Sequence, residues 1–349
     1  MAYALDRIEE GFHATDDTLT QETVSENLQT IDNIRLWDPR PLSDVYRQIQ
    51  LIRPYYDFKE ADVDRYMIDG RLRQVLLSTR EVAPEKLEPE SQTWVNTKLF
   101  YTHGIGVSMS PVTDFTSEGR PMFFAKDIPL DGVIPIKSHD STSEPDILVS
   151  NPRIYYGENT LDYVLVNTNT DELDFQTGEG SLVRTKYAGS GGVQLNSLIK
   201  RIAYAWEFAD INILISGELT GETLVQYHRH IQDRVRKVVP FLKLDSDPYV
   251  VATNDVFYWI QDLYSTSDQY PYSEPSEDDG STNYIRNSVK ATIDAYDGSI
   301  RLYIWDDDDP IIKKKSDYVK TSFESKIKFH IRMDRYRSDP NQILPYTYS

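Results

Sequence analysis

The residues best suited to chemistry lie in the short segment Thr102 to Gly106, where His103 stands beside two glycines. A histidine at the expected end of a strand offers an accessible imidazole that titrates near neutral pH, and the glycines allow a ligand to approach the backbone. Ser108 and Ser110 follow, but no Gly-x-Ser-x-Gly motif supports a Ser/His/acid triad. We take His103 and Tyr101 as candidate ligand-binding residues, and a structural histidine in a turn or β-bulge as the alternative.

The tyrosines are a second group of candidates. The chain contains 24 of them, and several stand close together in the sequence. A tyrosine combines a large apolar ring with a polar hydroxyl group, so it suits both strand packing and the binding of a glycan or a protein partner. Packing is the simpler interpretation. The further candidates for ligand binding are Tyr264, Tyr270, Tyr272 and Arg286.

Two segments contain metal-ligating residue types without the spacing that a metal site needs. The run Asp306 to Asp309 places four carboxylates in a row, whereas a calcium loop needs ligands at spaced positions. His228 and His230 fall in a predicted helix, where positions two apart point about 200° away from each other. We therefore predict no metal site, and a solvated acidic loop at Asp306 to Asp309, with bound calcium as the alternative.

No cofactor is predicted. The chain has no cysteine, which excludes disulfides, thiolate metal sites, iron–sulfur clusters and a cysteine nucleophile. The glycine-rich segment Gly189 to Gly192 precedes a helix, but it lacks the lysine and the Ser/Thr of a phosphate-binding loop. The interpretation that remains is a flexible entry to the helix.

The charge excludes one class of partner. The formal net charge is −19, from 56 acidic and 37 basic residues, so the surface repels the phosphate backbone of nucleic acids. The same charge opposes docking on an anionic bilayer surface. No run reaches the roughly 18 to 20 apolar residues that span a bilayer, and residues 1–10 lack a signal-peptide pattern. If the protein is exported or anchored, we expect the responsible segment to lie outside this chain.

Two amphipathic helices are predicted in the middle of the chain. The second covers residues 224–238, with Thr220 as its N-cap and Pro240 at its end. The first carries an apolar stripe at helical spacing, formed by Leu195, Leu198, Ile199, Ile202, Ala203 and Trp206. Near the start of the chain, a short helix that ends before Pro54 is predicted by Leu42, Val45, Ile49 and Ile52.

Most other segments are strand-like. Two hairpins are predicted around Asp69-Gly70 and Asp297-Gly298, because Asp-Gly tolerates the positive φ angles of a two-residue turn. A third hairpin joins residues 249–251 to 256–260. Further strands are predicted over residues 94–109, 122–126, 154–156 and 163–167. The predicted fold class is α+β, with β-rich antiparallel or mixed sheets and two central amphipathic helices.

The chain divides into three predicted parts. Residues 1–83 form an N-terminal arm with a helix and a hairpin, and residues 93–313 form the main α+β domain. The segment Pro84 to Gln92 between them has two prolines and three glutamates, which favours a boundary. Residues 314–349 form a locally basic tail without a recognisable stop, either truncated or foreign to the protein.

Several long sequence segments together resemble uncharacterised protein family 0182, a family of large multi-pass membrane proteins of actinobacteria, cyanobacteria and some other bacteria. The resemblance covers about residues 3–313, and the tail after about residue 320 departs from the expected pattern. The segments that carry it are Thr30 to Pro41, Arg65 to Val75, Trp94 to Asn96, Tyr101 to Gly106, Asp247 to Tyr249, Tyr270 to Ser273, Asn283 to Lys290 and Asp294 to Gly298.

The resemblance implies a context and no activity. Family members carry a bundle of transmembrane helices ahead of this region, which is then a large soluble domain on the extracytoplasmic side of the plasma membrane. No catalytic residues can be carried over, because the family has no established activity. The hairpin over residues 289–304 is also similar to the strand–turn–strand of PepSY-type extracytoplasmic modules, which are regulatory or inhibitory.

These observations favour a non-enzymatic domain that binds a cell-envelope protein or glycan on behalf of its own transmembrane segments, which this chain lacks. The first alternative is a cell-envelope enzyme that acts on a glycan or lipid-linked substrate through acidic residues and His103. The second is a structural element that covers the membrane helices, which predicts an exposed apolar docking surface.

Overall fold

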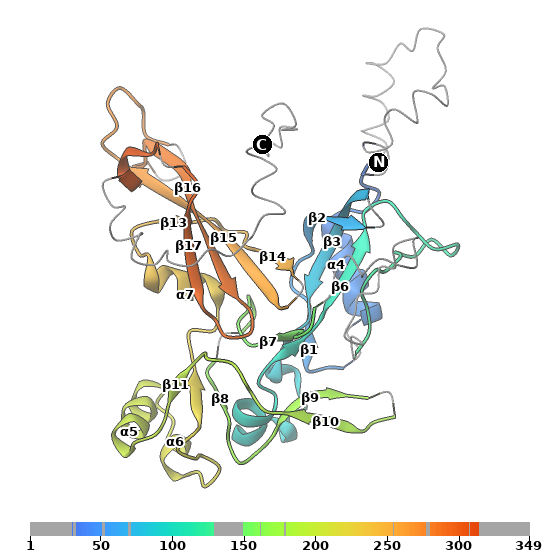
Figure 1. Cartoon of the computed structure of the whole chain (residues 1–349), viewed down its shortest axis with the longest axis vertical. Coiled ribbons are helices and arrows are strands. Elements are labelled where there is room, and N and C mark those ends of the chain that lie inside the picture. The colour runs from blue at the N-terminus through green and yellow to red at the C-terminus, as the bar shows by residue number, and fades with distance from the viewer. Residues whose placement is uncertain are drawn as a thin grey trace.

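The computed structural model describes residues 30, 33–50, 53–68, 71–128, 149–160, 162–177, 179–253, 255–276, 280–306 and 308–313. Within these ranges the fold is α+β, as the sequence predicts: several antiparallel sheets and few helices (Figure 1). The turn Asp69-Gly70 and the tail from residue 314 lie outside the described residues.

The largest sheet is built around one long hairpin, formed by residues 257–267 and 284–294, which we call the central hairpin. It contains β13 (Lys243–Leu244), β14 (Tyr249–Ala252), β15 (Phe257–Ser267), β16 (Tyr284–Asp294) and β17 (Ile300–Ile304), all paired antiparallel. The predicted hairpin of β16 and β17 is confirmed, with Ala291 opposite Leu302. Gly298 adopts the predicted positive φ, at 71°. The predicted hairpin of β14 and β15 is also confirmed.

A second antiparallel sheet lies beside α4 near the N-terminal end (Figure 1). The predicted early helix is α4 (Pro39–Gln50), and the predicted hairpin is β2 (Asp62–Ile68) with β3 (Arg71–Thr79). Leu42 and Tyr46 of α4 are fully buried against Leu76 of β3. Beyond the hairpin, β3 pairs with β6 (Val107–Pro111), and β1 (Tyr56–Asp57) pairs with β4 (Glu81–Val82).

The remaining elements lie in the middle and the lower part of the molecule in Figure 1. Three of the small sheets lie here. In the first, β5 (Gly104–Ile105) pairs with β7 (Arg153–Ile154), and in the second, β9 (Glu172–Gln176) pairs with β10 (Leu182–Thr185). In the third, β12 (Leu224–Gln226) lies between β8 (Val164–Val166) and β11 (Val193–Gln194). The helices are α5 (Leu198–Glu207), α6 (Asn212–Ile215) and α7 (Ile231–Val238), with the short turns η1 (Pro84–Lys86), η2 (Pro89–Ser91) and the π-helical η3 (Asn96–Phe100).

The structure corrects the second predicted helix, which begins at Ile231 and not near Leu224. Leu224–Gln226 is the central strand of a three-stranded sheet, so pairing on both sides overrides the helical spacing of its apolar residues. His228 has a positive φ of 48°, which is outside the right-handed helical region, so the helix cannot extend back through it. The N-cap is His230, whose Nδ1 accepts a hydrogen bond from Asp233 N at 3.4 Å, and not Thr220.

The strand predicted over residues 94–109 is confirmed in its second half, as β5 and β6, and is wrong in its first half, and the strand predicted over residues 122–126 is wrong. Of the strand predicted over residues 154–156, only Ile154 lies in a strand, β7. The segment from Trp94 to Phe100 is helical, because Thr93 accepts a hydrogen bond from the Asn96 backbone and Tyr101 N closes on Asn96 O at 2.8 Å. Over residues 122–126 the structure has an isolated bridge between Met109 and Ala125 in place of a strand. The strand predicted over residues 163–167 is confirmed as β8.

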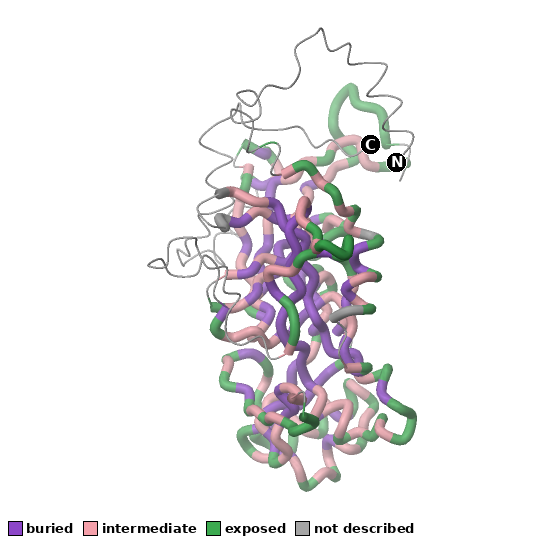
Figure 2. The backbone as a smooth tube through the Cα atoms, turned by 90° about the vertical axis from the view of Figure 1, so that its right-hand side faces the viewer, coloured by how far each residue is buried: buried purple, intermediate pink, exposed green. Residues whose placement is uncertain are grey.

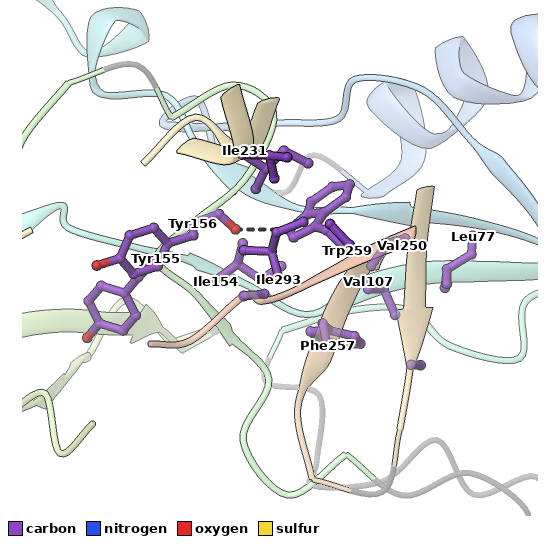
Figure 3. Close-up of a cluster of buried hydrophobic side chains, with 14 of the residues drawn as sticks. Leu77, Val107, Ile154, Tyr155, Tyr156, Ile231, Val250, Phe257, Trp259 and Ile293 are labelled. Atoms are coloured by element: carbon purple, nitrogen blue, oxygen red, sulfur yellow. Dashed lines mark hydrogen bonds between the residues drawn. The ribbon is translucent and has the colours of Figure 1, made fainter. Parts of the chain in front are cut away.

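The main core lies between the central hairpin, α7 and the β7 region (Figure 3). Trp259 of β15 is 1% exposed, and its Nε1 donates to the backbone oxygen of Tyr156 at 2.9 Å. Ile231 of α7 and Ile293 of β16 pack in the same cluster. Figure 2 shows this buried interior along the axis of the molecule and exposed segments at its lower end, where α5 and α6 lie.

Candidate functional site

The segment that contains His103 is built by close backbone packing. Thr102 and His103 follow the turn η3 and precede β5. A Cβ atom on Gly104 would lie 2.2 Å from the backbone oxygen of Arg80, so only glycine fits there. Gly106 has a φ of 72°. The two glycines beside His103 therefore serve the approach of the chain to itself, and not the approach of a ligand.

His103 is enclosed by polar groups. Its side chain has no solvent exposure, with Nε2 at 3.4 Å from Oδ1 of Asp174 and Nδ1 at 3.0 Å from Oγ1 of Thr102. Arg153 of β7 holds the same Asp174 through two parallel hydrogen bonds, Nε to Oδ1 at 2.7 Å and Nη2 to Oδ2 at 2.8 Å. The geometry of this pair is the bidentate arrangement that arginine favours. Asp174 thus joins the imidazole to the guanidinium.

Glu172, two residues earlier on β9, lies on the other side of the imidazole at 3.6 Å from Nδ1. Its Oε2 accepts hydrogen bonds from Thr102 Oγ1 at 2.5 Å and from the Tyr155 hydroxyl at 2.7 Å. Its Oε1 accepts from the backbone N–H of Tyr187 at 2.9 Å. The Tyr155 ring lies against His103, with ring centroids 4.6 Å apart. We call Thr102, His103, Arg153, Tyr155, Glu172 and Asp174 the His103 network.

Arg229 holds the backbone around this network. It is 3% exposed, and it donates from Nε to Tyr155 O at 2.7 Å and from Nη2 to Thr102 O at 2.6 Å. Burial lowers the pKa of Arg229 to about 10, which still leaves it charged at neutral pH. A buried cation that donates to backbone oxygens from two segments fixes their relative position.

The electrostatics of the network favour a protonated imidazole. Burial by itself lowers the pKa of His103, but the hydrogen bonds to Asp174 and Glu172 outweigh it, and the pKa is raised. For Asp174 the two effects have the opposite signs: burial raises its pKa, and the hydrogen bonds from His103 and Arg153 lower its pKa by more. The arrangement resembles a buried ion pair with satisfied hydrogen bonds. Catalysis would require a substrate to reach an imidazole that has no exposed surface.

The other candidate residues lie in two places. Tyr101 packs beside the network's segment against Tyr55, with ring centroids 4.7 Å apart. The remaining four candidates are on or beside β15 and β16. The hydroxyl of Tyr264 donates a hydrogen bond to Asp245 Oδ2 at 2.5 Å, and the ring of Tyr270 stacks on that of Tyr284 with centroids 5.2 Å apart. Tyr272 is fully exposed with a φ of 60°, and Arg286 Nη2 forms an ion pair with Asp306 Oδ2 at 2.5 Å. Among the described residues, no hydrogen bond, ion pair or ring contact joins the two groups.

The acidic run lies close to Arg286. Asp309 is fully buried, and its carboxylate accepts hydrogen bonds from the hydroxyl groups of Ser265 and Ser288. Burial raises the pKa of Asp309, but these hydrogen bonds lower it further than burial raises it. Asp309 is therefore a structural anchor and not part of a solvated loop. In the described ranges, no three His, Asp or Glu side chains are placed to hold a metal ion.

The most unusual surface of the molecule is apolar and lies on α5 and α6, at the lower left of Figure 1. Its α5 part consists of Leu198, Ile199, Ile202 and Trp206 from the stripe predicted for the first central helix, whereas Leu195 of that stripe precedes the helix and is buried. The sequence does not reveal to which side the stripe turns. Six large apolar side chains are at least half exposed: Leu198 (68%), Ile199 (79%), Ile202 (50%), Trp206 (84%), Ile211 (60%) and Ile215 (70%). We call these six residues the α5–α6 apolar surface.

A second side of α5 is packed against the rest of the domain. On α5, at about 100° per residue, the four exposed apolar residues fill one arc of about 100°. Tyr204, Ala205 and Phe208 fill a neighbouring arc and pack on the cluster that contains Leu165 of β8 and Val225 of β12. The helix is thus apolar on two sides, and the described part of the chain covers only one of them. Large exposed apolar patches of this kind mark interaction sites on soluble domains.

The turn between α5 and α6 is fixed by Asp210. Its Oδ2 accepts hydrogen bonds from Trp94 Nε1 at 2.9 Å and from the Tyr163 hydroxyl at 2.5 Å, and its Oδ1 accepts from Asn212 N at 3.0 Å. The Tyr163 ring stacks on Phe208, with centroids 4.3 Å apart and an interplanar angle of 7°. Sequence reasoning missed this group, because Trp94, Tyr163 and Asp210 are far apart along the chain and carry no local motif.

Among the described residues, no helix combines the length and the apolar composition that crossing a membrane requires. The model of the uncharacterised protein family UPF0182 matches residues 1–335, which extends past residue 313, where sequence analysis ended the resemblance. No solved structure matches the chain.

Three similar curated proteins are considerably longer than this chain. A UPF0182 protein of Desulforamulus reducens is 46% identical over 313 residues, which cover 89% of this chain and 32% of the relative. One of Moorella thermoacetica is 46% identical over 311 residues, covering 89% and 33%. One of Trichodesmium erythraeum is 39% identical, covering 99% and 39%. The chain therefore spans about a third of the length of these relatives.

Proposed function

The chain belongs to the uncharacterised protein family UPF0182, and from this premise we propose that it is a non-enzymatic interaction domain of a longer, multi-pass membrane protein. The domain lies on the extracytoplasmic side of the plasma membrane. Its α5–α6 apolar surface docks on the membrane-embedded part of the same protein and leaves the rest of the domain to contact a cell-envelope protein or glycan.

The α5–α6 apolar surface carries this proposal. Six large apolar side chains on two adjacent helices have no partner within the described ranges that would shield them from water. Burying one such side chain completely stabilises an association by about 1.5 to 3 kcal/mol. A surface of this size is a poor match for a domain that works alone in water, because it favours aggregation. Since the relatives are about three times as long, a partner within the same polypeptide is the simplest one.

The His103 network supports the non-enzymatic part of the proposal. Each carboxylate that contacts His103 already accepts hydrogen bonds from other groups of the chain, and the imidazole is fully buried. Glycoside hydrolysis needs two carboxyl groups about 5 to 10 Å apart on either side of a cleft that admits the sugar. Glu172 and Asp174 instead lie on either side of a histidine in the interior.

Thiol labelling tests both the orientation and the docking, because every thiol within this chain is an introduced one, and the full-length protein without an introduced cysteine gives the background. The exposed variants Ile199→Cys, Leu182→Cys and Glu222→Cys are made in the full-length protein in intact cells and treated with a membrane-impermeant maleimide. We expect Leu182→Cys and Glu222→Cys to react, and Ile199→Cys to be protected. Leu182 is the matched control, because it is an exposed apolar residue on a different element, β10.

Each part of the proposal can fail separately. Labelling of Glu222→Cys only after lysis would place the domain on the cytoplasmic side. Equal rates for Ile199→Cys and Leu182→Cys in intact membranes would show that the α5–α6 apolar surface is open to water and would overturn the docking. A photo-crosslinker at Ile199 then identifies the partner, and transfer to lipid or to a second protein in place of the membrane-embedded part would overturn the intramolecular assignment.

A further inference from the structure

A pocket with a volume of about 450 Å³ opens beside α7. Its wall is formed by α7, the segments around β11 and the end of β12, and the turn between β16 and β17. This volume is within the range of about 300 to 1,000 Å³ that is typical of small-molecule sites. None of the candidate residues suggested by the sequence lines it.

The charge of the pocket is opposite to that of the protein. The chain has 56 acidic and 37 basic residues, yet the lining contains His228, Arg234 and Lys237 and no carboxylate. Arg234 and Lys237 are three residues apart on α7, so they lie on one face of the helix. Apolar side chains of Val193, Val238 and Ile300 complete the wall. The pocket thus has a cationic part and an apolar part.

Arg234 is held in place by the elements that form the wall. Its Nε donates to Gly298 O at 2.6 Å, its Nη1 donates to Tyr227 O at 3.3 Å, and its guanidinium lies 4.6 Å from the centroid of the Tyr156 ring. Its Nη2 makes no hydrogen bond within the part of the chain that the structure describes. A donor that is fixed before a ligand arrives costs little entropy on binding.

Lys237 and His228 are exposed, and their side-chain nitrogens make no hydrogen bond or ion pair with the described residues. The nearby acids are already engaged elsewhere. Asp233 pairs with Arg236 at 2.7 Å, and Asp297 accepts from Ser190 Oγ at 2.9 Å and from Ser299 N at 3.0 Å. No ion pair therefore joins the cations of the pocket to a carboxylate of the described chain.

We infer that this pocket binds a small anionic ligand in which a phosphate group is attached to an apolar part. The anionic group contacts Arg234 Nη2 and Lys237, and the apolar part lies against Val193, Val238 and Ile300. Both a soluble phosphorylated molecule and the head-group region of an anionic lipid have this chemistry. The inference is independent of the docking of the α5–α6 apolar surface.

Calorimetric titration of the purified protein tests the inference with three probes. Dihexanoyl-phosphatidylglycerol carries an anionic head group and short apolar chains, glycerol 3-phosphate carries the anionic group alone, and dihexanoyl-phosphatidylcholine carries the chains without net charge. We expect saturable binding of the first probe. Binding of glycerol 3-phosphate with similar affinity would assign the pocket to soluble phosphorylated molecules, and its absence would assign it to lipid. Equal binding of phosphatidylcholine would overturn the requirement for an anion.

Two neighbouring variants separate a site from general electrostatic attraction. Lys237→Gln removes a charge that lines the pocket, and Arg236→Gln removes the same charge from the adjacent residue, which does not line it. Both side chains are exposed, so both variants should fold. We expect Lys237→Gln to weaken binding at least about tenfold, and Arg236→Gln, which also releases Asp233 from its ion pair, to weaken it by clearly less. Equal effects of the two variants, or no binding of any probe, would overturn the inference.

Discussion

The His103 network and the α5–α6 apolar surface differ in the way their residues depart from the usual division between core and surface. The network places an imidazole and two carboxylates inside the protein, beside the half-buried guanidinium of Arg153. The surface places isoleucine, leucine and tryptophan outside. In the network, every charged group has its partners within the chain. On the surface, the apolar groups have no such cover within the described ranges.

The difference between these two regions indicates where function lies in this molecule. Residue types that could do chemistry are used for structure when their hydrogen bonds are satisfied internally, as those of Glu172 and Asp174 are. Residue types that usually build a core indicate a partner when the fold leaves them uncovered, as it leaves Ile199 and Trp206. The predictions below test each side of this comparison.

The largest effect is expected from Glu172→Ala. This change leaves the Tyr155 hydroxyl and the Tyr187 N–H without their acceptor in the interior. We expect the free energy of unfolding to fall by about 3 to 5 kcal/mol, the usual cost of breaking a buried ionic network from one side. Urea unfolding measures it, with the exposed Glu222→Ala as control. A loss below about 1 kcal/mol would show that the network is not structural.

A pair of variants on α6 sharpens the contrast between covered and uncovered apolar residues. Ile213 is fully buried and Ile215 is 70% exposed, although only one residue separates them. Ile213→Ala should reduce the free energy of unfolding by about 2 to 5 kcal/mol, and Ile215→Ala should change it by no more than about 0.5 kcal/mol. Thermal unfolding of the two variants checks this. Similar losses would mean that Ile215 is covered in solution.

The glycine beside His103 offers a smaller test. In Gly104→Ala the new methyl group would lie 2.2 Å from Arg80 O, so the backbone must shift. Overpacking of this kind costs about 1 to 3 kcal/mol. Gly217→Ala is the control, since nothing lies within 4 Å of its added Cβ. If Gly104→Ala were as stable as Gly217→Ala, the close packing of Arg80 on this segment would be refuted.

The smallest effect concerns pH. The pKa of His103 is raised in the folded protein by its hydrogen bonds to Asp174 and Glu172, which outweigh burial. Its contribution to stability is therefore complete below the ordinary histidine pKa of about 6.5, and is lost as the pH rises through the higher folded value. The stability advantage of wild type over His103→Gln should therefore decrease from pH 6 to alkaline pH, as urea unfolding at each pH measures. An advantage that grows with pH would contradict a protonated imidazole.

Local patterns predicted much of the fold. The hairpin of β16 and β17 follows from strict alternation around Asp297-Gly298, and α4 follows from apolar residues at helical spacing. The second central helix was placed too early, because Leu224 and Tyr227 fit a helical stripe that continues into α7. Pairing of β12 with β8 and β11 decides the outcome there, and pairing between distant segments leaves no trace in local spacing.

The functional regions were harder to predict for the same reason. The sequence singled out His103 by its neighbours, but its burial depends on β9, some seventy residues later in the chain, as the separation of His103 and Asp174 shows. The apolar stripe of α5 was visible, whereas its direction is set by Tyr204 and Phe208 packing on β8 and β12. The basic pocket brings together β11, α7 and the β16–β17 turn, which no single segment reveals.

The carboxylate of Asp210 has a consequence for the strength of any association through α5 and α6. By tying Trp94, Tyr163 and Asn212 to the turn between the helices, it holds both in one orientation before a partner arrives. A rigid surface loses little conformational freedom on binding, so most of the free energy from apolar burial remains available as affinity. Asp210 is thus a residue that would tune the affinity of a contact in which it takes no direct part.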